Sequence, residues 1–487
     1  MQNTKTMNCA WMLFGILAVL SICLSHPIQM QAQCSGSTGN PAVYAKCGTG
    51  GTIGIQGSSA YIDASVIPGT GAKTDVCARI NAVLQSSTVT YPTAGAVIDA
   101  RGVGSGTTQV CSISPWGGTA PTGGWRPATI LLPSGVIVIP AGWTLPNETR
   151  IIGENAGPRS GTTDGVTTIQ ACVTGTTGCS ANLSGTLITM GSSVAAYNCP
   201  STGCIGVGVQ DLWLDGNGLS VNGISNTFSE DLSYVKHVNL YQIVGTGMGL
   251  SGTSQNSGPY TDIGFSLGSS TAAAGTTCAH LLSVSTRGIH GLTCTGNTSG
   301  SGTIPTSAVV LDTSNSSIED VEIQGFGNGI LVGENASAQN DVLLNIRGGT
   351  NVSKVIAIAN VSGNTVSDIS VIAASNGGNT SSTTIQDNRT SPASSITAST
   401  VAIYVLGNPI DASGTAFGYT RFTTAIGQPT WAVGSSTPSP TTGCTVGSLY
   451  SNTSGSGTGT SINTWYVCTP KSSNKCSSSA SCWTPIG

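Results

Sequence analysis

The sequence predicts an all-β protein, a single-stranded right-handed parallel β-helix with an N-terminal capping helix and a small disulfide-rich C-terminal module. Two observations support this prediction. Only 7% of the 487 residues are Asp, Glu, Lys or Arg and 67 are Gly, so Ser, Thr and Asn must supply most polar groups. These residues are typical of strands and turns. From about residue 205, short apolar runs also recur at a period that indicates a solenoid.

The N-terminus predicts a cleaved secretion signal over residues 1–32. Lys5 precedes an uncharged apolar run over residues 10–24, and Met30-Gln31-Ala32 suits cleavage after Ala32. A membrane anchor is the alternative, but the run is shorter than the roughly 20 residues that a spanning helix needs. We therefore expect a secreted, extracellular protein with no membrane segment after cleavage. Without the signal, 15 basic residues face 20 acidic residues, which argues against nucleic acid as a partner.

Fourteen cysteines remain after the signal, and an even number in an exported chain predicts disulfides. Zinc is the rival interpretation, but the expected Cys-x2-Cys pairs and neighbouring His are missing. Connectivity stays open, although close neighbours suggest clips across local loops. The close neighbours are Cys172 and Cys179, Cys199 and Cys204, Cys278 and Cys294, and Cys476 and Cys482.

The N-terminal part of the chain predicts one helix followed by short strands. Residues 33–73 form a Cys-containing segment, and the β-helix domain is expected over residues 74–400. Residues 74–84 place Val76, Ile80, Val83 and Leu84 on one helical face, with Thr74 as the N-cap. The strands are expected at residues 96–99, 129–132, 135–139 and 149–153.

The later strands repeat in a loose register. They are expected at residues 211–215, 237–241, 262–266, 320–324, 341–345 and 368–372. Their first residues lie 26, 25, 58, 21 and 27 positions apart, and the step of 58 has room for one extra turn. Stacked coils would align the inward residues as apolar ladders and the outward residues as one continuous face.

The C-terminal part departs from this repeat. Residues 401–442 contain two further strand-like runs and a Ser/Thr/Pro linker, and residues 443–487 form a small Cys-rich module. Its apolar content is thin, so disulfides among Cys444, Cys468, Cys476 and Cys482 are expected to hold it.

Several motifs resemble the N-terminal part of the pectate lyase superfamily of right-handed β-helices. They are the helix at residues 74–84 and the segments at residues 95–102, 131–135 and 150–154. The resemblance implies a protein that binds or cleaves polysaccharide, pectate lyase-like or glycoside hydrolase-like. The Asp-Asp, Gly-His-Gly and Arg-Ile-Lys motifs of the polygalacturonase branch are missing. A non-catalytic, adhesin-like β-helix that binds carbohydrate or attaches to a surface is the alternative.

The outward strand positions carry the candidate site. Carboxylates and a histidine can act as general acid and base, and aromatic or polar side chains can bind sugar rings. The candidate catalytic residues are Asp215, Glu322, Asp211, Asp262 and His237, and the candidate substrate-binding residues are Trp213, Tyr241, Asn239 and Arg287. Asp211 and Asp262, two coils apart, would be separated by about 9.6 Å.

A second interpretation of the acidic positions is structural. An Asp at the start of each strand can simply accept hydrogen bonds from backbone N–H groups of the preceding turn. Asp320 and Asp341 on neighbouring coils would approach to about 5 Å, close enough to hold a calcium ion. Ca2+ is the one cofactor that the sequence suggests.

Overall fold

The computed structural model describes most of the chain from residue 60 to residue 388 and four strands beyond it. The described residues are 60–66, 75–85, 95–157, 165–252, 256–268, 271–283, 286–299, 301–367, 369–375, 383–388, 431–434, 449–452, 465–470 and 481–486. The predicted secretion signal lies outside them. No helix among the described residues is long and apolar enough to cross a membrane.

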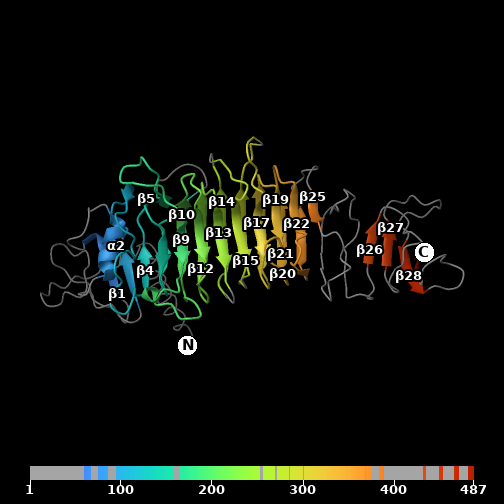
Figure 1. The fold of residues 1–487 in the computed structure, drawn as a ribbon, viewed down its shortest axis with the longest axis horizontal. Coiled ribbons are helices and arrows are strands. Elements are labelled where there is room, and N and C mark those ends of the chain that lie inside the picture. Colours follow the sequence, from blue (N-terminus) through green and yellow to red (C-terminus); the bar gives the residue numbers. More distant parts are fainter. Residues whose placement is uncertain are drawn as a thin grey trace, which may run out of the picture.

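Two parallel sheets wind around a common axis and form a β-solenoid (Figure 1). The main path of the first sheet contains β1 (Ala60–Asp63), β2 (Ala96–Asp99), β4 (Ala128–Leu131), β7 (Arg150–Ile152), β10 (Gly208–Asp215), β12 (Tyr234–Tyr241), β14 (Tyr260–Ser266), β16 (Ile289–Thr295), β18 (Ser317–Gln324), β21 (Val342–Gly348) and β24 (Ser370–Ser375). A branch of β3 (Thr107–Val110), β5 (Gly135–Ile139) and β8 (Thr167–Ala171) also ends on β10.

The second sheet closes each coil on the other side. It contains β6 (Trp143–Leu145), β9 (Thr186–Met190), β11 (Asn222–Asn226), β13 (Thr246–Ser251), β15 (Thr277–Leu282), β17 (Ser307–Asp312), β19 (Asn328–Val332), β22 (Lys354–Ile358) and β25 (Thr383–Asp387). Two short strands, β20 (Ala338–Gln339) and β23 (Val366–Ser367), pair separately. Short 3-10 turns occupy η1 (Ala64–Val66) and η2 (Ala195–Tyr197). The predicted parallel β-solenoid is therefore confirmed.

A bend inside the long strands explains why the first sheet branches. The first part of β10 pairs with β7 and its last part pairs with β8, on either side of Asp211. Asp211 has φ 55°, a left-handed conformation that Asp, Asn, His and Gly adopt more readily than other residues. From β10 onward, one bent strand therefore takes the place of the two shorter strands found in the earlier coils.

The same bend recurs at the aligned position of each following long strand. We call this set the bend column, and its members have φ between 50° and 74°: Asp211, His237, Asp262, Gly291, Asp320 and Asn345. The side chains that follow each bend return to the core. Leu212, Val238, Ile263, Leu292, Val321 and Ile346 stack in register and are at most 2% exposed.

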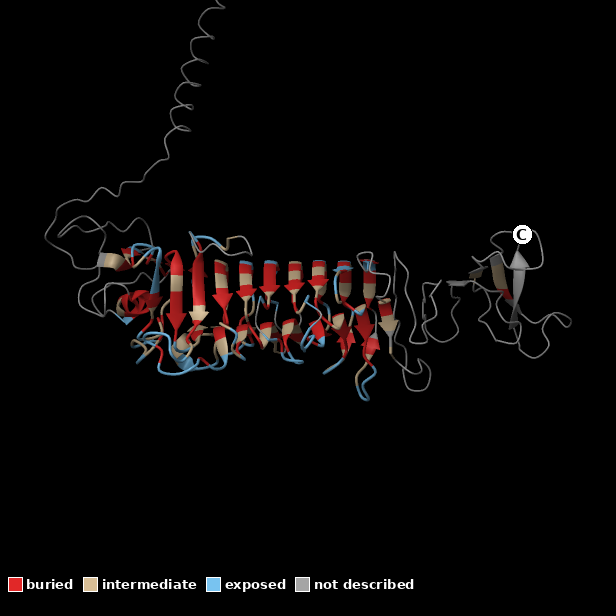
Figure 2. Cartoon of the chain, turned by 90° about the horizontal axis from the view of Figure 1, so that it is seen from above, coloured by how far each residue is buried: buried red, intermediate tan, exposed pale blue. Residues whose placement is uncertain are grey.

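One hydrophobic cluster of buried residues, from Ile62 to Ile385, runs along the described solenoid, and Figure 2 shows buried residues along its length. Burying one Leu, Ile or Val side chain stabilises the fold by about 1.5–3 kcal/mol. Each coil buries several such side chains, so each coil adds to the stability of the fold. The stacked coils thus share one elongated core, in place of the compact core of a globular domain.

The predicted helix is α2 (Val76–Gln85), at the end of the solenoid where the described chain begins (Figure 1). Its apolar face is buried as expected. The N-cap differs from the prediction, because Asp75 Oδ1 accepts a hydrogen bond from the Ala78 N–H at 2.9 Å, whereas Thr74 lies outside the described residues. A disulfide between Cys77 and Cys111 ties the helix to the chain that follows β3.

The predicted register is right in the first half of the repeat and wrong in the second. The step of 58 residues does contain an extra strand, β16, and the bend column passes through Gly291. At β21, however, Asp320 aligns with Asn345 and not with Asp341. Leu343 and Ile346 face the core there, so the repeat is displaced by four residues from the prediction. Asp368 lies outside the described residues.

Local disulfides join three of the predicted close pairs, namely Cys172 with Cys179, Cys199 with Cys204, and Cys278 with Cys294. In the C-terminal module, β26 (Trp431–Gly434), β27 (Leu449–Asn452), β28 (Trp465–Pro470) and β29 (Ser481–Ile486) form one sheet. Cys468 is buried and disulfide-bonded. Cys444 and Cys476 lie outside the described residues, and the side chain of Cys482 is not among those described.

Candidate functional site

Three of the predicted catalytic residues form a trio on the bend column, with His237 between two carboxylates. His237 Nδ1 lies 3.0 Å from Asp211 Oδ1, and His237 Nε2 lies 3.0 Å from Asp262 Oδ2. Their side chains are exposed over 29% (Asp211), 44% (His237) and 62% (Asp262) of their area. The repeat places them together because the three bends stack on successive coils, so each side chain leaves the solenoid at the same point.

The imidazole of His237 lies between the two carboxylates, with one ring nitrogen facing each. A neutral imidazole carries hydrogen on only one ring nitrogen, whereas both ring nitrogens of His237 lie at hydrogen-bond distance from a carboxylate. Carboxyl and imidazole groups are the types that act as general acid and general base.

An aromatic and amide cluster lies two residues further along the same strands. The rings of Trp213 and Tyr241 are 5.5 Å apart and tilted by 47°. The indole N–H of Trp213 donates to the Ala156 carbonyl, and Asn239 Nδ2 donates to the same oxygen at 2.9 Å. The segment around Ala156 therefore covers part of this cluster, a contact that the strand pattern could not predict.

The strand face next to this cluster is hollowed. A shallow recess is lined by Trp213, Asn239, Leu240, Tyr241, Gly264, Phe265 and Ser266. Beyond it, a pocket of about 310 Å³ opens between the segments that follow β14 and β16, lined by Leu267, Gly268, Thr271, Ala272, Gly296, Asn297, Thr298, Ser299, Ser301, Gly302 and Thr303. Gly268 in the pocket wall packs against Tyr241 of the recess, because a Cβ there would lie 2.7 Å from the Tyr241 hydroxyl.

Among the described residues, the pocket walls carry hydroxyl and amide groups and no charged side chain. Asn297 holds its segment in shape, since its amide donates to the Ser301 carbonyl at 2.6 Å and to the Thr303 carbonyl at 3.1 Å. Asn351 Nδ2, two coils further along, donates to the Thr298 carbonyl at 3.0 Å. The pocket therefore offers a fixed set of neutral polar groups.

Asp215 and Glu322, also predicted as catalytic residues, do not join the trio. Asp215 is 8% exposed, and its carboxylate accepts hydrogen bonds from Gln170 Nε2 at 2.7 Å and from the Asn217 N–H at 2.8 Å. Burial raises the pKa of Asp215, and these hydrogen bonds partly oppose the rise. Glu322 aligns with Thr293 and Arg347 on coils beyond the trio and accepts from Gln324 Nε2 at 3.0 Å.

Arg287 and the proposed calcium pair are also placed elsewhere. The Arg287 guanidinium lies 3.8 Å from Asp231 Oδ1, away from the trio. Asp320 accepts a hydrogen bond from Asn345 Nδ2 at 2.7 Å on the surface, whereas Asp341 is fully buried and accepts from the Ser316 N–H at 2.9 Å. The two carboxylates therefore do not face each other, because the predicted register was wrong by four residues, and they form no calcium site.

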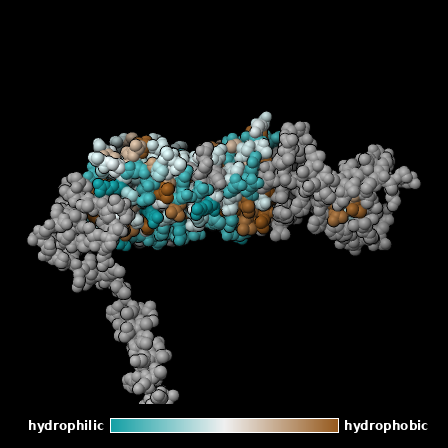
Figure 3. All heavy atoms as spheres, turned by 90° about the horizontal axis from the view of Figure 1, so that it is seen from below, coloured by the Kyte–Doolittle hydropathy of each residue, from teal (hydrophilic) through white to brown (hydrophobic). Residues whose placement is uncertain are grey.

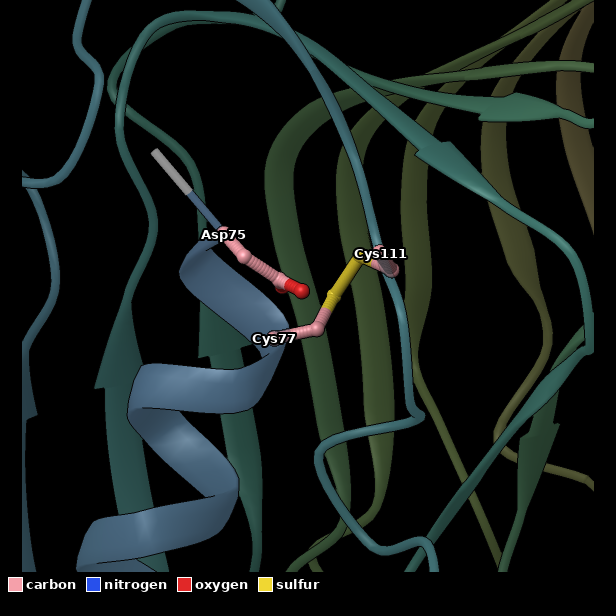
Figure 4. A group of neighbouring side chains, drawn as sticks. All are labelled: Asp75, Cys77 and Cys111. Atoms are coloured by element: carbon pink, nitrogen blue, oxygen red, sulfur yellow. A yellow bond between two sulfur atoms is a disulfide. The ribbon is translucent and has the colours of Figure 1, made fainter. Parts of the chain in front are cut away.

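Another acidic cluster has a structural role. Asp75, Cys77 and Cys111 bring potential ligand atoms within 4.8 Å of one another (Figure 4). The two sulfur atoms are joined in a disulfide, so neither is a thiolate. The Asp75 oxygens accept hydrogen bonds from the Ala78 N–H and from the backbone and hydroxyl of Ser112. These residues fit a helix cap and a disulfide link and do not fit a metal centre.

The outer surface is mostly hydrophilic or near neutral, and its hydrophobic areas are small on the face drawn in Figure 3.

The three described histidines all lie beside carboxylates, with His280 next to Asp312 at 3.2 Å and His290 next to Glu319 at 3.0 Å. Only His237 contacts a carboxylate through each ring nitrogen within the part of the chain that the structure describes. This distinguishes the trio from the other pairs.

No family model matches the sequence, and no curated protein matches it. The fold was compared with solved structures. The A-module of a mannuronan C-5 epimerase from Azotobacter vinelandii aligns over 54% of this chain and 83% of its own, with 14% identity and a TM-score of 0.27. The catalytic domain of a GH87 α-1,3-glucanase in complex with nigerose aligns over 70% of this chain and 71% of its own, with 13% identity and a TM-score of 0.25.

Proposed function

We propose that this chain is a secreted glycoside hydrolase that binds a neutral polysaccharide on the bent-strand face and cleaves it at the Asp211–His237–Asp262 trio. The observation that carries the proposal is the trio itself, in which two exposed carboxylates are joined through one imidazole. Their backbones lie two coils, or about 9.6 Å, apart, and their oxygens approach closer because both contact His237. Inverting glycosidases separate their carboxyl groups by roughly 6.5–9.5 Å.

Each member of the trio has a role in this reaction. Asp262, the most exposed, donates a proton to the glycosidic oxygen as the bond from that oxygen to the sugar carbon breaks. Asp211 accepts a proton from the water whose oxygen forms the new bond to that carbon. After one turnover Asp262 lacks a proton and Asp211 has gained one. His237 bridges them and can return the proton to Asp262, which restores the starting state.

The surroundings favour a neutral substrate. The recess beside Trp213 and Tyr241 supplies aromatic faces, and the adjoining pocket supplies hydroxyl and amide groups without charge. A uronate polymer would place carboxylates beside Asp211 and Asp262, where like charges repel. A neutral chain avoids this repulsion.

A non-catalytic glycan-binding protein is the second candidate, and one observation favours it. The bend column continues beyond the trio at Asp320 and Asn345, which are joined by a simple hydrogen bond. Polar residues therefore also occupy bends that lie outside the trio, as expected if the column serves mainly to shape the backbone. In that case the trio would be one more set of stacked polar bends.

The first experiment separates these candidates. The exported protein, with its disulfides formed, is incubated with a panel of neutral and uronate polysaccharides, with and without calcium. New reducing ends without ultraviolet absorbance would establish hydrolysis. Unsaturated products that require calcium would indicate a lyase and contradict the proposed reaction. Binding without any product would support the glycan-binding protein.

Asn substitutions test the trio without disturbing the bends, because Asn also adopts the left-handed conformation readily. Asp262→Asn and Asp211→Asn should each lower kcat by about 10²-fold or more, since each removes a proton-transfer group. Asp320→Asn is the matched control at the same bend on a later coil, and it should leave kcat unchanged. Equal activity in all three variants would remove the trio from the mechanism.

A further inference from the structure

The bend column contains one position without a side chain, Gly291. On one side of it, His237 lies 3.0 Å from a carboxylate oxygen of Asp211 and 3.0 Å from one of Asp262, and on the other side Asn345 donates to Asp320. Gly291 aligns between Asp262 and Asp320 on the coil that separates these two groups. The column is therefore interrupted at the edge of the trio.

The Asp262 carboxylate borders the space beside the Gly291 backbone. A Cβ built on Gly291 would lie only 2.9 Å from Asp262 Oδ1, closer than real Cβ atoms approach other atoms. The Asp262 side chain is exposed, so it would rotate away from such a Cβ. That rotation would move Oδ2 away from His237 Nε2, to which it is now 3.0 Å.

The glycine also leaves Asp262 Oδ1 open to solvent. Among the described residues no donor contacts this oxygen, whereas Asp320 Oδ1 receives the Asn345 amide at 2.7 Å. The neighbouring outward side chains do not fill the gap, because His290 Nδ1 is 3.0 Å from Glu319 Oε2 and its Nε2 is 3.3 Å from the Arg287 carbonyl.

We propose that Gly291 is a positioning residue for the proposed reaction: it lets Asp262 lie against His237 while Oδ1 stays accessible to the glycosidic oxygen of the substrate. This inference rests on the proposed function of the trio. It assigns the cleavage point of the glycan to the gap above Gly291, next to the recess that Trp213 and Tyr241 line.

Gly291→Asn is the direct test, because the φ of 74° at this bend is close to the conformation that Asn adopts at Asn345. The new Cβ would turn the Asp262 carboxylate away from His237, and the amide would then bond Asp262 Oδ1 as Asn345 bonds Asp320, so kcat should fall by about tenfold or more while KM for the glycan changes little. Asn345→Gly is the reciprocal control. It opens a gap beside Asp320, away from the trio, and should leave kcat and KM unchanged.

Chemical labelling provides a readout that needs no enzymatic activity. A water-soluble carbodiimide with an amine couples to accessible carboxylates, and peptide mass spectrometry reports each site. Asp262 should be labelled in the original chain and protected in Gly291→Asn, whereas Asp320 should become more reactive in Asn345→Gly. Unfolding temperatures of the variants confirm that each one is folded.

The outcomes separate the inference from the function. If the original chain cleaves glycans and Gly291→Asn retains full kcat, the inference is overturned and the proposed function stands. If no glycan is cleaved by the original chain, the proposed function fails. The inference fails with it, and the labelling then shows only whether Gly291 controls access to Asp262. Equal labelling of Asp262 in both proteins overturns the inference directly.

Discussion

The buried carboxyl group of Asp341 should make the stability of this protein depend on pH. Its side chain is fully buried just before β21, where Oδ1 accepts the Ser316 N–H and Oδ2 has no hydrogen-bond partner. Burial raises the pKa of this carboxyl from 3.8 to about 7, and the backbone hydrogen bonds oppose only part of the rise. The folded chain therefore holds this proton more tightly than the unfolded chain.

The sign and size follow from that difference. Below about pH 4 the group is protonated in both states and has no effect on the free energy of unfolding. As the pH rises towards 7 the unfolded chain loses the proton first, so the group destabilises the fold, by about 4 kcal/mol at the limit. Asp341→Asn removes the titration but keeps an oxygen acceptor for Ser316.

Chemical unfolding of both proteins at pH 4.5 and pH 8 measures the effect. The Asn amide adds an unpartnered buried donor at both pH values, so its cost cancels in the comparison. The gain in stability from Asp341→Asn should be larger at pH 8 than at pH 4.5 by about 3 kcal/mol. Asp320→Asn, an exposed carboxylate on the neighbouring coil, serves as the control. A gain that is equal at both pH values would refute the reasoning.

Two further predictions concern the parts that frame the site. Replacing both Cys77 and Cys111 by Ser should destabilise the fold by about 3–4 kcal/mol. The same change at Cys172 and Cys179 should cost less, because that disulfide closes a loop of 7 residues and not 34. Thermal unfolding of both variants gives the comparison, and the opposite order would contradict the loop argument. Trp213→Ala removes the indole donor to Ala156, so hydrogen exchange at residues 153–157 should become faster while exchange in β12 stays unchanged.

The strand repeat was predictable where two inward apolar residues follow the bend with a single outward residue between them. In β10, β12 and β14 that outward residue is Trp213, Asn239 or Gly264, and the spacing set the register that brings the three bends together. In β21 the run Val342-Leu343-Leu344 offers apolar residues on both faces. The sequence pattern selected the wrong face there, and Asp341 was assigned to a surface that it does not reach.

Two features of the site depend on contacts between distant parts of the chain. The cover over Trp213 and Asn239 comes from Ala156, 57 residues before the tryptophan, and no periodic pattern encodes such a contact. Gly291 has no side chain, and the sequence alone does not distinguish it from the other glycines among the 67. A recurring Asp, Asn, His or Gly inside apolar strands was the available signal, because these residues tolerate the left-handed bend.

The bend column also shows how a structural requirement and a chemical one can share the same positions. The bend selects a short list of residue types, and three of them, Asp, Asn and His, carry polar groups that point outward at intervals of about 4.8 Å. Stacking alone then creates rows of carboxylates, amides and imidazoles on the solenoid surface. A stacked row gains a chemical function only where its composition departs from what the bend requires. The trio shows such a departure in the imidazole that contacts two carboxylates, and Gly291 shows it in the space left beside Asp262. Replacing each with Asn keeps the bend and removes the departure, so these variants separate shape from chemistry.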